Sequence, residues 1–157
     1  MPPSGAGWPI PGSVSDGLSR WAARRLAGMI VLDASVLIAY LDPNDVNHDA
    51  AVELLADAAP PLVVHPITAA GVLMAPVRRG IEEAVWADLV AIGMEVDSSP
   101  IDPIKLARLR ATTGCKMPDC CVLAVADTRQ AAVATFDDRL ARHAKLSPRI
   151  LHLHADE

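Results

Sequence analysis

Short runs rich in aliphatic residues recur along this chain, and longer segments of helical character separate them. Runs without strict alternation of apolar and polar residues are typical of strands buried on both faces of a parallel sheet. Strands that alternate with helices place those helices on both faces of the sheet. We therefore predict a three-layer α/β fold with a short parallel sheet flanked by helices. The predicted strands are residues 30–33, 62–64, 94–96, 132–135 and 150–153.

The helices are predicted from apolar spacing and from residues that start or stop a helix. We expect Pro76 to end or kink one of them, and Gly114 to follow the end of another. In the segment 81–92, the side chains of Ala84, Val85, Leu89 and Ile92 are expected to point inward. The predicted helices are residues 34–41, 46–58, 68 to about 76, 81–92, 102–113, 119–128 and 138–144.

The composition limits the classes of protein that this chain can belong to. It is 52% hydrophobic but only 3% aromatic, so the core must consist mainly of Ala, Val, Leu and Ile. The net charge of −5 argues against a simple basic nucleic-acid-binding module, but not against an enzyme in which metal ions supply positive charge. Cys115, Cys120 and Cys121 are expected to be reduced, mostly buried thiols, as in a cytoplasmic protein. No apolar run approaches the roughly 20 residues of a membrane span.

The first 28 residues differ in composition from the rest of the chain. They are rich in Pro and Gly, which favours loop or disorder, although residues 17–28 have the pattern of a short basic helix. We expect residues 1–28 to be a flexible extension, or a segment preceding a natural start at Met29. Residues 29–157 are expected to form one domain.

Three aspartates are expected to meet at one edge of the predicted sheet. Asp33 and Asp137 come at or just after the carboxyl ends of predicted strands, where α/β sheets bind ligands, and Asp119 begins a helix. Carboxylates gathered in this way need a cation, and Mg²⁺ or Mn²⁺ is the natural partner for oxygen ligands. Taken singly, Asp119 and Asp137 are also explained as helix caps, whereas aspartate is disfavoured in a strand such as the one that Asp33 ends.

Three segments of the chain resemble PIN domains, and most closely the VapC-type toxins of bacterial toxin–antitoxin pairs. They are residues 29–41 (MIVLDASVLIAYL), 113–126 (TGCKMPDCCVLAVA) and 134–140 (ATFDDRL), in the same order and spacing. The resemblance covers essentially residues 29–153. It implies a magnesium-dependent ribonuclease that acts on RNA, forms a homodimer and is blocked by a small VapB-type antitoxin.

The resemblance also implies roles for individual residues. Asp33, Asp119 and Asp137 match the metal-binding catalytic acids, and Ser35 matches a small hydroxyl residue that assists the site. Thr135, in the Ala-Thr-Phe-Asp segment, is a further supporting residue, and the adjacent Asp138 could share the role of Asp137. Lys116, close to Asp119 in the sequence, is a candidate for contact with RNA.

One position departs from the family pattern. VapC-type toxins usually carry a glutamate where Gly71 stands, so the site has one carboxylate fewer and should bind metal more weakly. The helix also lacks a possible capping box, because Thr68 and position 71 have the spacing of that motif. A degenerate PIN fold that only binds antitoxin or RNA is therefore the alternative to a nuclease. A phosphatase-like hydrolase of similar architecture is a third possibility.

Overall fold

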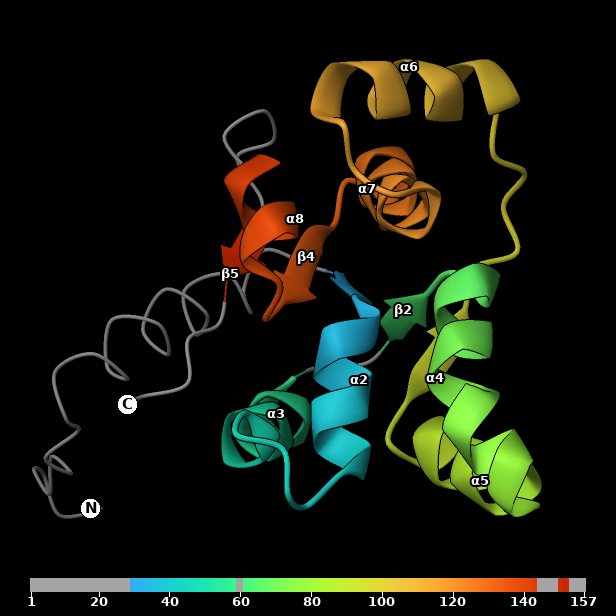
Figure 1. The fold of residues 1–157 in the computed structure, drawn as a ribbon, viewed down its shortest axis with the longest axis vertical. Coiled ribbons are helices and arrows are strands. Elements are labelled where there is room, and N and C mark those ends of the chain that lie inside the picture. The colour runs from blue at the N-terminus through green and yellow to red at the C-terminus, as the bar shows by residue number, and fades with distance from the viewer. Residues whose placement is uncertain (1–28, 59–60, 144–149, 153–157) are drawn as a thin grey trace, which may run out of the picture.

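Five parallel strands form the centre of the domain, in the order β3-β2-β1-β4-β5 (Figure 1). The computed structural model describes residues 29–58, 61–143 and the backbone of 150–152, so the predicted extension at residues 1–28 lies outside the described residues. The strands are β1 (Ile30–Leu32), β2 (Leu62–Val64), β3 (Met94–Val96), β4 (Ala132–Thr135) and β5 (Ile150–His152). The predicted three-layer α/β fold is confirmed.

Seven helices connect the strands in the described part of the chain. None of them is long and apolar enough to cross a membrane. They are α2 (Ala34–Leu41), α3 (His48–Asp57), α4 (Pro66–Arg79), α5 (Glu82–Ala91), α6 (Pro103–Thr113), α7 (Met117–Arg129) and α8 (Asp138–Arg142).

The two faces of the sheet bury different side chains, because successive residues of a strand point to opposite sides. Ile30 and Leu32 of β1 pack with α2, α3, α4 and α5 on one face, and Val31 packs with α7 on the other. Figure 1 shows the first group of helices below the sheet and α7, covered by α6, above it. Cys120 and Cys121 are free and buried in α7, and Cys115 is free and buried just before it, as expected of thiols that act as small hydrophobes.

The pairing of β1 with β4 brings distant parts of the chain together. Leu32 lies opposite Ala134, and the backbone N–H of Asp33 donates to the carbonyl of Ala134 at 3.0 Å. The carboxyl ends of these two central strands are therefore neighbours at one edge of the sheet.

Three local predictions are wrong. Helix α4 begins at Pro66 and continues through Pro76 to Arg79, because Pro76 is near its end and buried, so packing offsets the lost hydrogen bond. Thr68 consequently lies inside the helix and cannot cap it; the Nδ1 of His65 caps it instead, by accepting the N–H of Ile67 at 3.1 Å. In α5, at the periphery, only Leu89 is fully buried, and Ala84 is exposed rather than inward.

Candidate active site

Asp33 is held in place at the end of β1 by two hydroxyl groups. Its side chain is only 6% exposed, and its Oδ2 accepts from the Oγ of Ser35 at 2.7 Å and from the Oγ1 of Thr135 at 2.8 Å. Asp33 also occupies the N-cap position of α2, but its side chain makes no capping hydrogen bond. Among the described residues, the hydrogen-bond partners of this side chain are neutral hydroxyls. They do not neutralise the carboxylate, which can therefore bind a cation.

The same two hydroxyls connect Asp33 to the turn after β4. The backbone N–H of Asp137 donates to Thr135 at 2.9 Å, and the N–H of Phe136 donates to Ser35 at 3.0 Å. Thr135 is fully buried, whereas Ser35 and Asp137 are half-buried, so the network runs from the core to the surface of the site. Ser35 and Thr135, predicted as supporting residues, thus fix the position of Asp33 relative to Asp137.

Asp137 caps α8 as well as facing the site. Its Oδ1 accepts the N–H of Arg139 at 2.7 Å, which is the capping role that sequence left open. Its charge nevertheless acts on Asp119, whereas that of Asp138 is not among the influences on Asp119. Asp138 is exposed in the first turn of α8, so the structure favours Asp137 of the two as a member of the site.

Asp119 lies in the first turn of α7, where the structure brings it into electrostatic contact with the other two acids. Burial raises the pKa of Asp119, and the negative charges of Asp33 and Asp137 raise it further. Lys116 and Arg139 act in the opposite direction. The three predicted aspartates therefore share one environment, although they come from three separate elements.

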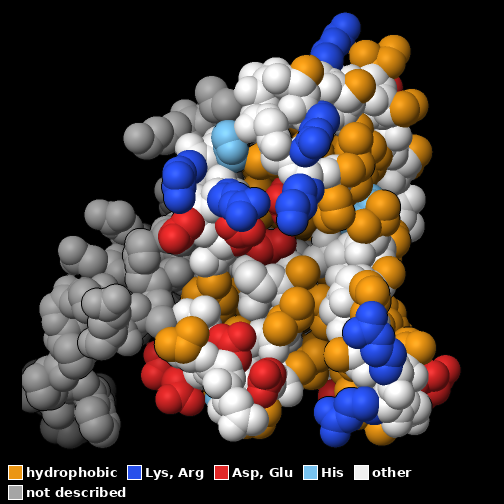
Figure 2. Space-filling model, viewed as in Figure 1, with side chains coloured by type: hydrophobic (Ala, Val, Ile, Leu, Met, Phe, Trp, Pro, Cys, Tyr) orange, Lys and Arg blue, Asp and Glu red, His pale blue; other side chains and the backbone are white. Residues whose placement is uncertain are grey.

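A basic rim, formed by Lys116 and Arg139, borders these acids. Figure 2 shows acidic side chains in a hollow near the middle of this face, with Lys and Arg side chains along its α7 and α8 side. Lys116 was predicted, but Arg139 was missed because its relation to Asp119 depends on where the turn after β4 places α8. The signal available in the sequence was its place two residues after Asp137, in the first turn of a helix.

The donor chemistry of the site fits a hard divalent cation. All three acids supply oxygen, and their mutual repulsion is expressed in the raised pKa of Asp119. Among the described residues, no group of three or more His, Cys, Asp or Glu side chains lies close enough together to hold a metal ion by itself. Mg²⁺ does not require one, because it keeps several waters and uses one or two carboxylates together with substrate phosphates.

Gly71 adds no carboxylate to this cluster, and two histidines of the chain, His48 and His65, bond elsewhere. Gly71 is exposed on α4, which packs against α2 and α7, and a Cβ added there would meet nothing within 4 Å. His65 caps α4, and His48 donates from Nδ1 to the carbonyl of Ala39 at 2.8 Å. Both histidines therefore have structural roles rather than roles as ligands.

The raised pKa of Asp119 predicts how stability depends on pH in metal-free protein. The folded state binds the proton of this carboxyl more tightly than the unfolded state does, so the free energy of unfolding falls as pH rises from the unfolded to the folded pKa. Urea denaturation across this acidic range should show that fall in the wild type. Asp119→Asn should reduce it, and an unchanged profile in the variant would contradict the assignment.

The geometry defines a parallel α/β domain with an acidic hollow at the carboxyl ends of its central strands. A family model described as the PIN domain matches residues 30–146, well over half of the chain. The chain therefore belongs to the PIN-domain family, as its sequence motifs predicted. No curated protein matches it closely enough to count as a relative.

Two solved structures share this fold. A toxin–antitoxin complex from Klebsiella pneumoniae superposes with a TM-score of 0.65 at 18% identity, covering 82% of this chain and 98% of that one. VapC20 of Mycobacterium tuberculosis, a toxin described as cleaving the sarcin–ricin loop, gives a TM-score of 0.58 at 16% identity, covering 72% and 93%. At these identities the similarity establishes the fold.

Proposed function

We propose that residues 29–157 form a toxin-type, metal-dependent endoribonuclease that hydrolyses RNA phosphodiester bonds. The observation that carries this proposal is that hydrogen bonds through Thr135 hold Asp33 beside the turn of Asp137, with Asp119 near enough for both charges to raise its pKa. Membership of the PIN-domain family and the fold shared with VapC20 support it.

Each residue of the site has a role in this proposal. Asp33, fixed by Ser35 and Thr135, would be the principal ligand of Mg²⁺ or Mn²⁺, with Asp119 and Asp137 binding directly or through water. When bound, such an ion supplies Lewis acidity that activates water and neutralises charge on the phosphate. Asp119, in the first turn of α7, would add a third carboxylate to these oxygen ligands.

The basic rim would offset the electrostatic repulsion between this acidic chain and RNA. With a net charge of −5 and three acids in the hollow, this protein should repel RNA at long range. Lys116 and Arg139 border the acids and would bind the phosphates on either side of the cleaved bond. RNA would then be positioned by these two cations and by the metal.

An exposed apolar stripe on α4 supports the proposal that this chain binds protein partners. We propose that these partners are a cognate VapB-type antitoxin and a second copy of the chain. Ile67, Met74 and Val77 lie on one side of this helix and are 48%, 55% and 56% exposed. Several large apolar side chains together on one helix face are typical of an interaction surface. The cytoplasm remains the predicted compartment.

Cleavage of RNA by the purified protein, with Mg²⁺ or Mn²⁺ and then with a chelator, tests the proposed function. We expect the metal-dependent rate to be low in the wild type and to rise on the order of tenfold in Gly71→Glu, equivalent to about 1.4 kcal/mol. Position 71 has open space for the new side chain, and losing a helical glycine should also stabilise α4 by about 0.5–1 kcal/mol.

Gly71→Ala is the matched control, because it removes the glycine without adding a carboxylate. A rate gain in Gly71→Glu but not in Gly71→Ala would support a weakened nuclease. If neither the wild type nor Gly71→Glu cleaves RNA with metal, but both still bind an antitoxin, the result would favour the alternative of a PIN fold that only binds its partner. Turnover of small phosphate esters without RNA cleavage would instead indicate a phosphatase.

A further inference from the structure

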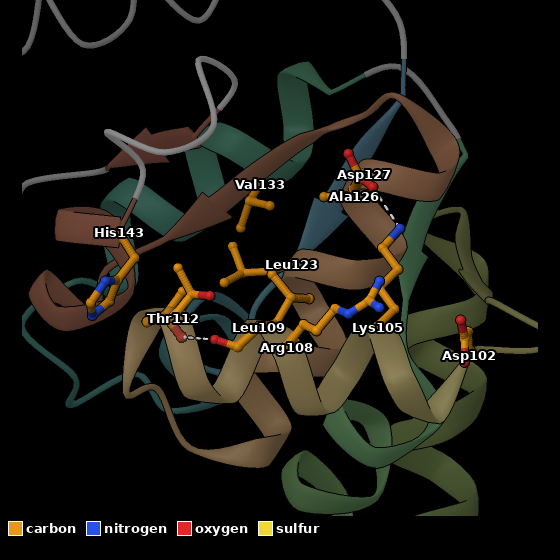
Figure 3. Close-up of a pocket in the computed structure, with 11 residues that line it drawn as sticks. Asp102, Lys105, Arg108, Leu109, Thr112, Leu123, Ala126, Asp127, Val133 and His143 are labelled. Atoms are coloured by element: carbon orange, nitrogen blue, oxygen red, sulfur yellow. Dashed lines mark hydrogen bonds and ion pairs between the residues drawn. The ribbon is translucent and has the colours of Figure 1, made fainter.

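A second hollow lies on the α6 side of α7, away from the three acids. It is a pocket of about 650 Å³ between α6, α7, β4 and the end of α8 (Figure 3). That volume is within the range of about 300–1,000 Å³ that is usual for small-molecule sites. None of the residues assigned to the acidic hollow lines it.

The floor of the pocket is apolar and rigid. Leu123 of α7 and Val133 of β4 belong to the core and are 8% and 1% exposed, and Leu109 of α6 packs against them. Figure 3 shows these three side chains meeting in the middle of the pocket. Such a floor can receive the flat face of an uncharged ring by van der Waals contact.

Among the described residues on the rim of the pocket, Arg108 is a cation that is available for a ligand. Lys105 is already paired with Asp127, at 2.5 Å from its Oδ2. Arg108 makes no hydrogen bond or ion pair with any other described residue, and Figure 3 shows it extending along the pocket towards Lys105. A guanidinium at the edge of an apolar pocket is well suited to bind a phosphate through two hydrogen bonds.

Two short segments of the chain connect the pocket with the acidic hollow. Thr112 and Thr113 line the pocket, and the chain runs from them through Gly114 and Cys115 to Lys116 of the basic rim. The guanidinium of Arg110 donates to the carbonyls of Gly114 and Cys115, which braces this connection.

The second connecting segment is α8 with the residue that follows it. His143, which follows this helix, lines the pocket, and Arg139 lies one turn earlier in the basic rim. Lys116 and Arg139 of the basic rim are thus each within four residues of a residue that lines the pocket.

We propose that this pocket is a subsite for one nucleotide beside the cleaved bond, which receives the base on its apolar floor and the phosphate at Arg108. The inference rests on the proposed ribonuclease function and names a determinant of its sequence preference. A free nucleoside monophosphate and a nucleotide within RNA would present the same base and phosphate to this pocket. The aromatic base would contact the apolar floor, and the charged phosphate would bind Arg108 on the rim.

Two variants change the pocket without touching the acids. Arg108→Gln removes the free cation, and Thr112→Trp, at an exposed position of α6, places an indole in the pocket mouth. Arg79→Gln is the matched control, because Arg79 is also an exposed helical arginine but lies at the end of α4. Circular dichroism and thermal unfolding establish that each variant is folded.

The first measurement is cleavage of a random-sequence RNA pool, with the products sequenced. Arg108→Gln should raise KM by about fivefold to tenfold and weaken the base preference at one position near the cut, with a smaller change in kcat. Thr112→Trp should alter the same position, and Arg79→Gln should match the wild type. Identical KM and base preference in all four proteins would overturn the subsite while leaving the proposed nuclease intact.

The second measurement is binding of AMP, GMP, CMP and UMP, followed by NMR, and it does not depend on cleavage. Binding that shifts Leu109 and Leu123 signals and is lost in Arg108→Gln supports the pocket, even if the protein cleaves no RNA and the proposed function fails. Displacement of the bound nucleotide by RNA would place the natural ligand within RNA, and its persistence would indicate a free nucleotide. Binding that is equal in wild type and Arg108→Gln overturns the assignment of the phosphate to Arg108.

Discussion

Asp33→Asn should lower the metal-dependent rate of RNA cleavage by about 10²-fold to 10³-fold, the scale seen when one electrostatic contact to a transition state is lost. Asparagine has nearly the same shape, and its carbonyl oxygen can still accept a hydrogen bond from Ser35 or Thr135. The variant therefore removes the charge of the proposed metal ligand while keeping the position of the side chain. Initial rates over a series of Mg²⁺ concentrations measure the effect.

An electrostatic control accompanies this prediction. Since the charge of Asp33 helps to raise the pKa of Asp119, that pKa should move back towards its ordinary value in Asp33→Asn, which NMR titration can follow. Asp88→Asn, on the exposed surface of α5, removes one acidic charge elsewhere and should keep full activity. Equal cleavage by Asp33→Asn and wild type would contradict the proposed site.

Arg129→Met should destabilise the domain by about 3–5 kcal/mol, the usual cost of leaving a buried charge without its partner. Asp97 follows β3 with a side chain only 2% exposed, and its Oδ1 accepts from Nε and Nη2 of Arg129 at 2.8 and 2.5 Å. Methionine preserves the packing of the arginine stem but provides no donor. Urea denaturation at neutral pH measures the loss.

A double variant and a surface variant separate the buried charge from general effects of substitution. Asp97→Asn combined with Arg129→Met should lose less stability than Arg129→Met alone, because no unpaired charge remains. Lys105→Met breaks an exposed ion pair with Asp127 and should cost no more than about 1 kcal/mol. A loss in Arg129→Met as small as that would show that the buried pair contributes little.

The strands were predictable because each is aliphatic enough to be recognised alone. The bounds of the helices were less so, as α4 shows: the sequence favoured a start at Thr68 and an end near Pro76, yet the helix extends from Pro66 to Arg79. Local signals from proline and threonine were overridden by burial of Pro76 and by a histidine cap, neither of which the sequence reveals.

For the site, sequence indicated which acids lie at strand ends, and the structure adds how they interact. The convergence of Asp119 with Asp33 depends on the packing of α7, and the contribution of Arg139 depends on the turn after β4. The pocket at Arg108 depends on the contact of α6 with α7, so no motif indicates it. Properties of a single segment were predictable, whereas properties of contacts between segments were not.

The bond between Thr135 and Asp33 joins residues 102 positions apart, and this separation has a consequence during synthesis. A chain growing on the ribosome has Asp33 long before β4 exists to pair with β1. Until residues 132–137 leave the exit tunnel, Asp33 lacks the hydroxyl of Thr135 and the neighbouring charge of Asp137. The acidic hollow is therefore completed only after β4 and the turn that follows it have been made, so a chain that stops before residue 132 carries no assembled site.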